Sequence, residues 1–433
     1  MRNFTLLLAG SALALVSVST TAFAGGFQRG TADTDILYEK GTFSSRFGMT
    51  YVNPNRGFSS INGQDGDFSD YTGIYQIPSA SIAFGNDDVA CAGTFTEAFA
   101  AEADYTGSPG GALPAQASSV PGVGGDIDDD QRTNLAAASS VSQTRSIGFN
   151  SNEFGLTCRA SYTVDYGRFS LLGGLFVEDF QFEGSSLSTT FTTIGGRRVP
   201  VVTTQIDVDS EGSYETGYRI GAAFEMPEIA LRVQALYRSE VKHDEIAGDG
   251  TVTILSSLIP SRPVGAVIPV SSYLNEATSP QSFTVNAQTG IAEGTLLLAS
   301  FRWTDWSTNK SAISSISNVA AGIDSSSYSP YNWDDGYTAS IGIGRAFTDE
   351  ISGAIALGYD SGVSTGSETT YTDLYTVSGG VSLKPNKWAE IRFGGLVGYW
   401  TEGDQSVSDD AYFNAHVDDT FVYGGNASLK LSF

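Results

Sequence analysis

Apolar and polar residues alternate along several segments of the chain, most regularly at its C-terminal end. From Thr420 to Phe433 the odd-numbered positions are apolar or small, whereas the even-numbered positions are mostly polar. Because neighbouring side chains of a β-strand point to opposite faces, the segment is predicted to be a strand with one apolar and one polar face. The same alternation recurs at 229–237, 351–359 and 389–399. The pattern predicts an all-β protein.

The lengths of the connections separate a membrane barrel from a soluble β-sandwich. Every second connection is short, such as 227–228 and 385–387, and those in between are long, the longest spanning 106–149 and 244–280. This rhythm is typical of outer-membrane barrels, in which short turns face the periplasm and long loops face outside. A sandwich would turn about every 8–12 residues. We predict a transmembrane antiparallel up-and-down β-barrel of 14 strands, at 44–61, 74–85, 88–105, 150–164, 168–184, 213–226, 229–243, 281–290, 294–306, 336–347, 350–359, 372–384, 388–400 and 419–432.

The first 24 residues have the features of a secretory signal peptide. Arg2 supplies a positive charge, residues 6–18 are mostly apolar, and Ala22 to Ala24 form an A-x-A cleavage site. A membrane anchor is the alternative, but the apolar run is short for a helix that spans a bilayer. Cleavage is expected to leave Gly25 as the first residue of a protein exported to the bacterial outer membrane.

The charge balance removes several classes of function. The chain carries 48 acidic and 23 basic residues, a formal net charge of −25. Nucleic acid is therefore excluded as a partner, because phosphate contacts need a basic surface. The acidic segments 126–130 and 207–215 lack the spacing of an EF-hand, so no metal site is expected.

The sequence contains no convincing catalytic arrangement. His243 lies beside Asp244 at the predicted rim of the barrel, and His416 lies in a predicted loop. The chain has no G-x-S-x-G elbow, P-loop or zinc-binding spacing. We therefore expect neither an enzyme nor a cofactor, and an outer-membrane hydrolase is the weaker alternative.

The two cysteines of the chain, Cys91 and Cys158, fall on the third and fourth predicted strands with the same outward parity. These strands are neighbours in an up-and-down barrel, and the periplasm is an oxidising compartment that allows disulfides. We predict a bond between the two residues, with two free thiols as the alternative.

Several short motifs resemble the FadL family of outer-membrane transporters for long-chain fatty acids and aromatic hydrocarbons. The resemblance extends over most of the mature chain, and its motifs are specific in only a few places. It implies a barrel of 14 strands, an N-terminal plug inside the lumen, and sideways release of substrate at a kink in the third strand. The motifs are Gly26–Phe27, Tyr51–Pro54, Ile77–Ser79, Pro280–Phe283 with Phe301–Ser307, and Trp333–Tyr337.

The expected plug is shorter than is usual in that family. About 17 residues, 25–41, separate the cleavage site from the first predicted strand, and Asn53–Pro54 is followed by Asn55 rather than completing the family's Asn-Pro-Ala motif. We predict a signal peptide at 1–24, a short plug at 25–43 that contains Gly26 and Phe27, and a barrel at 44–433. How so short a plug closes the lumen stays open.

The resemblance implies passive uptake of hydrophobic compounds, above all long-chain fatty acids. A carboxylate head group needs a cation, and Arg159 and Arg302 have inward parity, which we place mid-barrel or toward the loops. Ordinary interior salt bridges are the alternative for both. The segment 244–280 is unusually apolar for an extracellular loop, so it either captures substrate or packs over the barrel mouth.

The expected partners are therefore hydrophobic small molecules, with outer-membrane lipid and lipopolysaccharide around a monomeric barrel. A monomer is expected because a closed barrel leaves no strand edge for another chain. A general diffusion porin or a purely structural surface barrel is the main alternative function.

Overall fold

The computed structural model describes residues 25–39, 41–66, 68, 70–118, 135, 138–244, 246–275 and 277–433. The predicted signal peptide, 1–24, and the acidic segment 126–130 lie outside the described residues. Within the described part of the chain, no helix is both long and apolar enough to cross a membrane.

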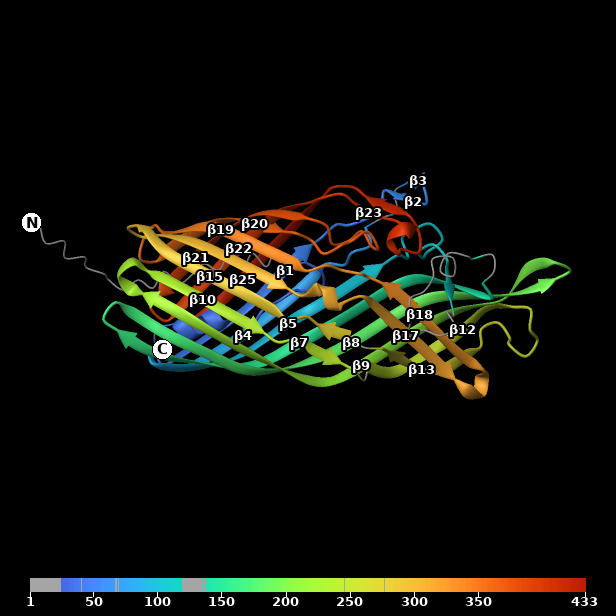
Figure 1. The fold of residues 1–433 in the computed structure, drawn as a ribbon, viewed down its shortest axis with the longest axis horizontal. Helices are drawn as coiled ribbons and strands as arrows, with labels where there is room; N and C mark the ends of the chain where they lie inside the picture. Colours follow the sequence, from blue (N-terminus) through green and yellow to red (C-terminus); the bar gives the residue numbers. More distant parts are fainter. Residues whose placement is uncertain are drawn as a thin grey trace, which may run out of the picture.

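Fourteen antiparallel strands close into a barrel, as the sequence predicted (Figure 1). Each strand pairs with its neighbour along the chain, and the first strand also pairs with the last, Ser44 opposite Ser432. The strands are β1 (Phe43–Asn53), β4 (Tyr75–Gly85), β5 (Val89–Asp104), β7 (Ser140–Val164), β8 (Gly167–Ile194), β9 (Arg197–Met226), β10 (Leu231–Arg238), β15 (Ser282–Ala292), β16 (Thr295–Thr304), β19 (Gly336–Ala346), β20 (Ile351–Asp360), β21 (Leu374–Asn386), β22 (Ala389–Trp400) and β25 (Thr420–Ser432).

The strands present apolar side chains outward and polar side chains inward. On β25, Phe421 and Tyr423 are more than half exposed, whereas Val422 and Lys430 are buried. On β22, Phe393 is exposed and Arg392 is buried. A soluble protein would place the apolar face in its core, but a membrane barrel turns that face to lipid. The outward apolar band is therefore the surface that contacts the outer membrane.

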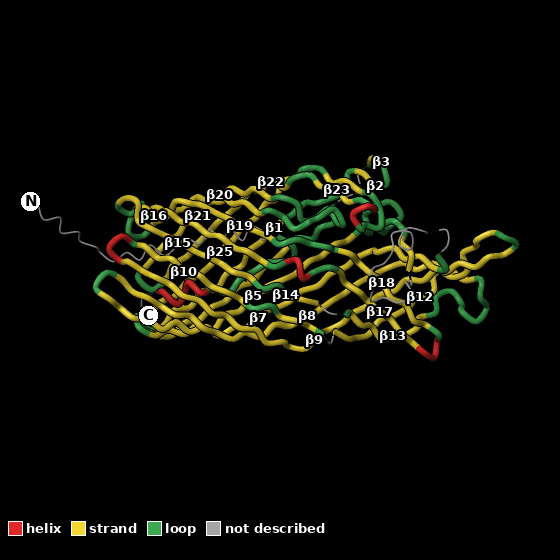
Figure 2. Tube along the Cα trace, viewed as in Figure 1, coloured by secondary structure: helices red, strands yellow, loops and turns green. Residues whose placement is uncertain are grey.

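Three strands continue well beyond this band on the side of the long loops, at the right of Figure 2. On β8 the exposed outward residues change from Leu171 and Leu175 to Gln181 and Glu183, so the outer part of the strand faces water. Four further strands lengthen this sheet: β12 pairs with β9, β13 with β12, β17 with β13, and β18 with β17. Their bounds are β12 (Ile246–Ser257), β13 (Val267–Leu274), β17 (Ser311–Asn318) and β18 (Ile323–Pro330).

The structure corrects several of the predicted boundaries. The segments 185–212 and 244–280, expected to be loops, are mostly strand, and the first strand ends at Asn53 rather than at residue 61. The remaining elements are short: β2 (Ser60–Ile61), β3 (Gln64–Asp65), β6 (Gln116–Ser118), β11 (Val241–His243), β14 (Ala277–Ser279), β23 (Gly403–Gln405), β24 (Ala415–Val417), and the 3₁₀ turns η1 (Thr34–Tyr38), η2 (Pro227–Ile229), η3 (Trp306–Thr308), η4 (Val319–Ala321) and η5 (Val407–Asp409).

The N-terminal segment 25–39 runs through the interior of the barrel. Its single turn, η1, buries Ile36 and Leu37 against inward residues of the wall such as Ala92 and Leu172. Because the segment crosses the lumen, it decides where a small molecule could pass.

Candidate functional site

A cluster of aromatic rings surrounds Phe27 of the N-terminal segment, in the part of the lumen nearer the long loops. Phe149 comes from β7, Trp306 from η3 after β16, and Tyr331 and Trp333 from the connection between β18 and β19. Connections at the barrel rim therefore fold inward and meet the N-terminal segment. Five ring centroids lie within 6.0 Å of the Phe27 ring centroid: Trp333 at 4.5 Å, Phe149 at 4.6 Å, Tyr331 at 5.5 Å, Tyr371 at 5.6 Å and Trp306 at 6.0 Å.

A cavity of about 190 Å³ adjoins this cluster, and we call it the aromatic cavity. Phe27, Tyr71, Phe99, Phe180 and Trp306 are among the residues that line it. An apolar cavity of about 150 Å³ is large enough to stay dry and hold benzene. The aromatic cavity therefore has the size and the lining to hold a ring or a segment of alkyl chain.

The aromatic cavity carries acidic residues and no cation among its described lining residues. Glu102 and Glu368 are its two charged residues. The Glu368 carboxylate accepts hydrogen bonds from Trp333 Nε1 at 3.1 Å and from the backbone N of Thr370 at 2.5 Å. Burial raises the pKa of Glu368, because desolvation disfavours the charged form. This lining therefore offers a carboxylate head group no counter-ion.

The first residues of the N-terminal segment fit closely against the wall. The backbone N of Gly25 donates a hydrogen bond to Asp360 Oδ2 at 2.6 Å. Gly26 has φ +62°, and a Cβ at this position would lie 2.9 Å from the Trp306 ring. Only glycine meets both demands without strain. The predicted plug residues Gly26 and Phe27 thus lie together at the aromatic cavity.

The barrel wall opens beside the aromatic cavity, between β4 and β5. The pairing of β4 with β5 ends at Ser79 and Thr96, and the register of β5 against β7 shifts between Glu97 and Phe99. Beyond this point the N-terminal segment, rather than β4, pairs with β5. The hydrogen bonds run from Arg29 N to Ala98 O at 2.8 Å, from Gly30 N to Glu97 O at 2.8 Å, and from Ala100 N to Phe27 O at 3.0 Å.

A second cavity of about 340 Å³ lies at this opening, and we call it the lateral cavity. It shares Tyr75, Ala101 and Phe149 with the lining of the aromatic cavity. Its lining is polar and acidic: besides Gln76 it contains the carboxylates Glu97, Glu102, Glu183, Asp209 and Glu211. The two cavities therefore adjoin each other at this opening in the wall.

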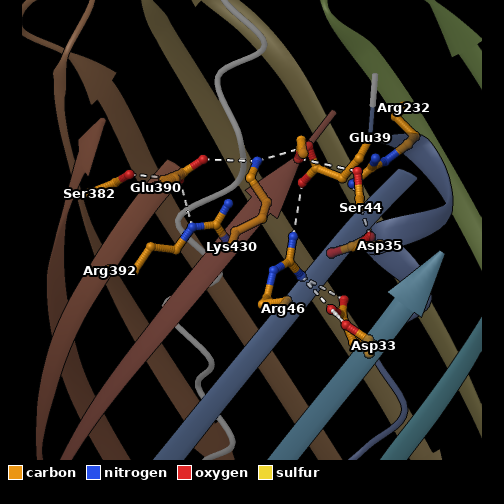
Figure 3. A network of polar contacts seen from close by, with 12 residues as sticks. Asp33, Asp35, Glu39, Ser44, Arg46, Arg232, Ser382, Glu390, Arg392 and Lys430 are labelled. Carbon is orange, nitrogen blue, oxygen red and sulfur yellow. Dashed lines mark hydrogen bonds and ion pairs between the residues drawn. The ribbon is translucent and has the colours of Figure 1, made fainter. Parts of the chain in front are cut away.

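On the periplasmic side of the aromatic cavity, ion pairs connect the N-terminal segment to the barrel wall (Figure 3). Arg46 of β1 contacts Asp33 at 2.6 Å and Glu39 at 2.9 Å. Lys430 of β25 contacts Glu39 and Glu390, each at 2.8 Å. We call this set the floor network; it also contains Arg392 bound to Glu390, and Arg232 bound to Asp35. An apolar molecule would have to separate these charges to continue toward the periplasm, which is costly.

The two predicted head-group cations lie in different places. Arg159 faces inward as predicted, but it lies at the periplasmic end rather than mid-barrel or toward the loops. Its Nη2 donates to the backbone O of Asn86 and Asp87 in the β4–β5 turn, at 3.3 and 3.2 Å. Its Nη1 lies 3.6 Å from Glu225. Arg159 therefore binds structural partners, and its predicted position is corrected.

Arg302 of β16 lies closer to the aromatic cavity, four residues before Trp306. Its Nε donates to Thr284 Oγ1 at 3.0 Å. Within the described part of the chain, no carboxylate forms an ion pair with it. Of the two predicted cations, Arg302 is therefore the one that is not paired with a carboxylate among the described residues.

Cys91 of β5 and Cys158 of β7 are register partners and are joined by a disulfide in the structure. The bond crosses two strands on the periplasmic side of the β5 register shift. We predict that mass spectrometry after alkylation without reduction will find both residues unmodified, and that reduction first will allow both to be labelled. Full labelling without reductant would show that the thiols are free.

Sequence analysis missed most of the residues that form the aromatic cavity. Tyr71, Tyr331 and Tyr371 lie in connections, where the strand alternation gives no signal. Trp306 and Trp333 belong to the motifs of the family resemblance, and this was the one signal that could have drawn attention to them. Asp360 ends β20 and carries no sequence feature that marks it.

The fold has counterparts among solved structures. A FadL homologue from Pseudomonas aeruginosa matches with a TM-score of 0.64 and 11% identity, over 95% of this chain and 96% of that one. The toluene transporter TodX of Pseudomonas putida matches with a TM-score of 0.59 and 12% identity, over 92% of each chain. The toluene transporter TbuX of Ralstonia pickettii matches with a TM-score of 0.56 and 14% identity, over 92% and 90%.

No family model matches the sequence, and no curated protein matches it either. The likeness to the solved structures confirms the predicted resemblance to FadL at the level of the fold. At 11–14% identity it shows the fold alone.

Proposed function

We propose that the protein admits uncharged hydrophobic molecules passively through the outer membrane. A molecule enters from outside, occupies the aromatic cavity and leaves sideways through the gap between β4 and β5 into the lipid. The observation that carries the proposal is the shared lining of the two cavities at Tyr75, Ala101 and Phe149. The solved structures described as toluene transporters have the same fold, which supports a substrate of this chemical class.

The floor network supports sideways release over transfer to the periplasm. An apolar molecule gains about 0.8 kcal/mol per CH₂ when it leaves water, and the membrane interior offers that gain directly. The charged floor offers none, and its ion pairs would have to break. The lower-energy route from the aromatic cavity leads through the gap between β4 and β5.

The N-terminal segment closes this path at rest. Phe27 occupies the centre of the aromatic cluster, and its backbone O accepts a hydrogen bond from Ala100 N of β5 at the gap. Gly25, the first residue after the predicted cleavage site, contacts the buried Asp360. Cleavage would turn the Gly25 nitrogen into an ammonium group and this contact into an ion pair. A hydrophobic molecule that moves from the aromatic cavity to the gap must displace Phe27, so passage and opening are coupled.

Uptake assays separate this function from a porin. Cells that lack the protein should take up hexadecane and toluene slowly, and the restored gene should return the wild-type rate. Liposomes that contain the purified protein should not swell in glucose, because the N-terminal segment and the floor network lie across the lumen. Swelling in glucose, with normal hexadecane uptake in the deletion strain, would replace the proposal with the porin alternative.

Long-chain fatty acids are a second candidate substrate, and the free charge of Arg302 favours them. If they are the substrate, Arg302→Ala should weaken hexadecanoate binding roughly tenfold, the size of a lost charge-assisted hydrogen bond. Binding of hexadecane should not change. Arg159→Ala is the matched control, because this cation lies at the periplasmic end. Equal affinities of wild type and Arg302→Ala for hexadecanoate would leave Arg302 as a structural residue.

A further inference from the structure

The outer strands enclose another cavity, farther from the membrane than the aromatic cavity. It measures about 80 Å³ and lies between β7, β8 and β9 on one side and β17 and β18 on the other. Eleven of its 17 lining residues are serine or threonine, and none of these 17 is charged. We call it the serine vestibule. It shares Ile147 and Phe182 with the aromatic cavity, so the two cavities adjoin.

One hydroxyl of the serine vestibule is buried without a partner. Ser142 is 7% exposed, and its Oγ makes no hydrogen bond within the described part of the chain. Buried polar groups nearly always have a partner. An unpartnered hydroxyl in the wall of a cavity therefore marks a position where a bound molecule can supply the missing hydrogen bond.

Further hydroxyls continue from Ser142 toward the aromatic cavity. Ser142 of β7 lies opposite Ser188 of β8, and Thr144 lies opposite Ser186 on the next rung of the same face. All four line the serine vestibule. A hydroxyl both donates and accepts, so this wall matches a head group that also does both. Ions gain less from it, because it offers no opposite charge.

The charges around the path disfavour an anionic head group. Among the described residues, neither the serine vestibule nor the aromatic cavity has a lysine, arginine or histidine in its lining. The two charged residues of the aromatic cavity are Glu102 and Glu368. A carboxylate would lose its water here without gaining a counter-ion.

The distance from Ser142 to the aromatic cluster sets the length of the molecule. Seven residues of β7 separate Ser142 from Phe149, and at about 3.3 Å per residue they span roughly 23 Å. A long alkyl chain bridges that distance, whereas a single aromatic ring does not.

We infer that the substrate is an uncharged long-chain amphiphile whose polar end carries hydroxyl groups, as in a long-chain alcohol or a monoacylglycerol. The hydroxyl end binds in the serine vestibule, and the alkyl chain lies in the aromatic cavity. This inference rests on the proposed function and specifies the substrate class.

Competition binding tests the inference on the purified full chain. Native mass spectrometry would compare equimolar hexadecan-1-ol, hexadecane and hexadecanoate at pH 8. The alcohol should occupy the protein about fivefold more than hexadecane, the factor given by one net hydrogen bond. It should also exceed hexadecanoate. Equal occupancy by alcohol and hexadecane would overturn the inference while leaving the proposed function intact.

Variants then locate the preference. The double variant Ser142→Val with Ser186→Val should lose the preference for the alcohol and keep its binding of hexadecane. Thr189→Val is the matched control: it lies next to Ser188 on β8, does not line the vestibule, and its hydroxyl instead contacts that of Thr203 at 3.3 Å. Heat-modifiable gel migration would establish that each variant is folded.

Three other outcomes have defined meanings. A double variant that still prefers the alcohol would overturn the inference. Stronger binding of hexadecanoate than of hexadecanol would overturn it in favour of the fatty-acid candidate and Arg302. Failure of all three molecules to bind would reject the proposed function together with the inference.

Discussion

Replacing Ala101 by tryptophan is expected to stop the uptake of hydrophobic molecules without preventing the barrel from folding. Ala101 of β5 lies just beyond the register shift and lines both the aromatic and the lateral cavity. A tryptophan ring at this position would fill the connection between them. Uptake of hexadecane should fall to the rate of cells that lack the protein, as measured with a radiolabelled substrate.

The matched control is Ala222→Trp on β9. Ala222 is exposed on the outer face of the barrel, so the added ring would face lipid. This variant should retain the wild-type rate of uptake and the same heat-modifiable migration. If Ala101→Trp also retained normal uptake while folded, the sideways path between β4 and β5 would not be the route of the substrate.

The membrane part of the fold was predictable because lipid imposes a strict alternation. Each strand must turn apolar residues outward, and the sequence at 351–359 and 389–399 shows this directly. The outer strands face water and carry no such constraint. In β17 and β18 serines occupy both faces, so no alternation of apolar and polar residues marks them as strands.

The apolar segment 244–280 was expected to be a loop that either captures substrate or packs over the barrel mouth. The loop assignment is wrong, because most of the segment is strand. In the structure Val252 and Ile254 belong to β12 and are buried against neighbouring strands. Their apolar character comes from the packing of the extracellular extension, and the serine vestibule lies between strands of this extension.

The position of Arg159 shows what alternation leaves undetermined. A period of two gives the face of a strand on which a residue lies, and Arg159 does face the lumen. Its depth depends on the stagger between strands. Because Arg159 lies opposite Ala90, it reaches the β4–β5 turn at the periplasmic end. The aromatic cavity was equally hidden, since Phe27, Trp306 and Tyr371 meet only through the closed barrel.

Replacing Arg46 by alanine is expected to let small polar solutes pass through the lumen. Arg46 links the wall to two carboxylates of the N-terminal segment, Asp33 and Glu39. Its removal leaves both carboxylates without this partner inside the barrel, and breaking a buried pair in this way costs about 3 kcal/mol or more. The segment should detach from β1 for part of the time, and an open lumen with polar walls conducts ions.

Planar-bilayer recordings would measure this effect as new conductance in Arg46→Ala that the wild type lacks. Arg345→Ala is the control, because Arg345 is exposed on β19 and forms no ion pair in the described part of the chain. Asp33→Asn breaks part of the same contact and should give a smaller or rarer opening, which provides a second test if Arg46→Ala does not fold. Closed channels in both floor variants, with hexadecane uptake intact, would show that packing around η1 holds the segment without the floor network. New conductance together with unchanged hexadecane uptake would show that the polar route and the sideways hydrophobic route are separate, as expected if the floor network only seals the lumen beneath the aromatic cavity.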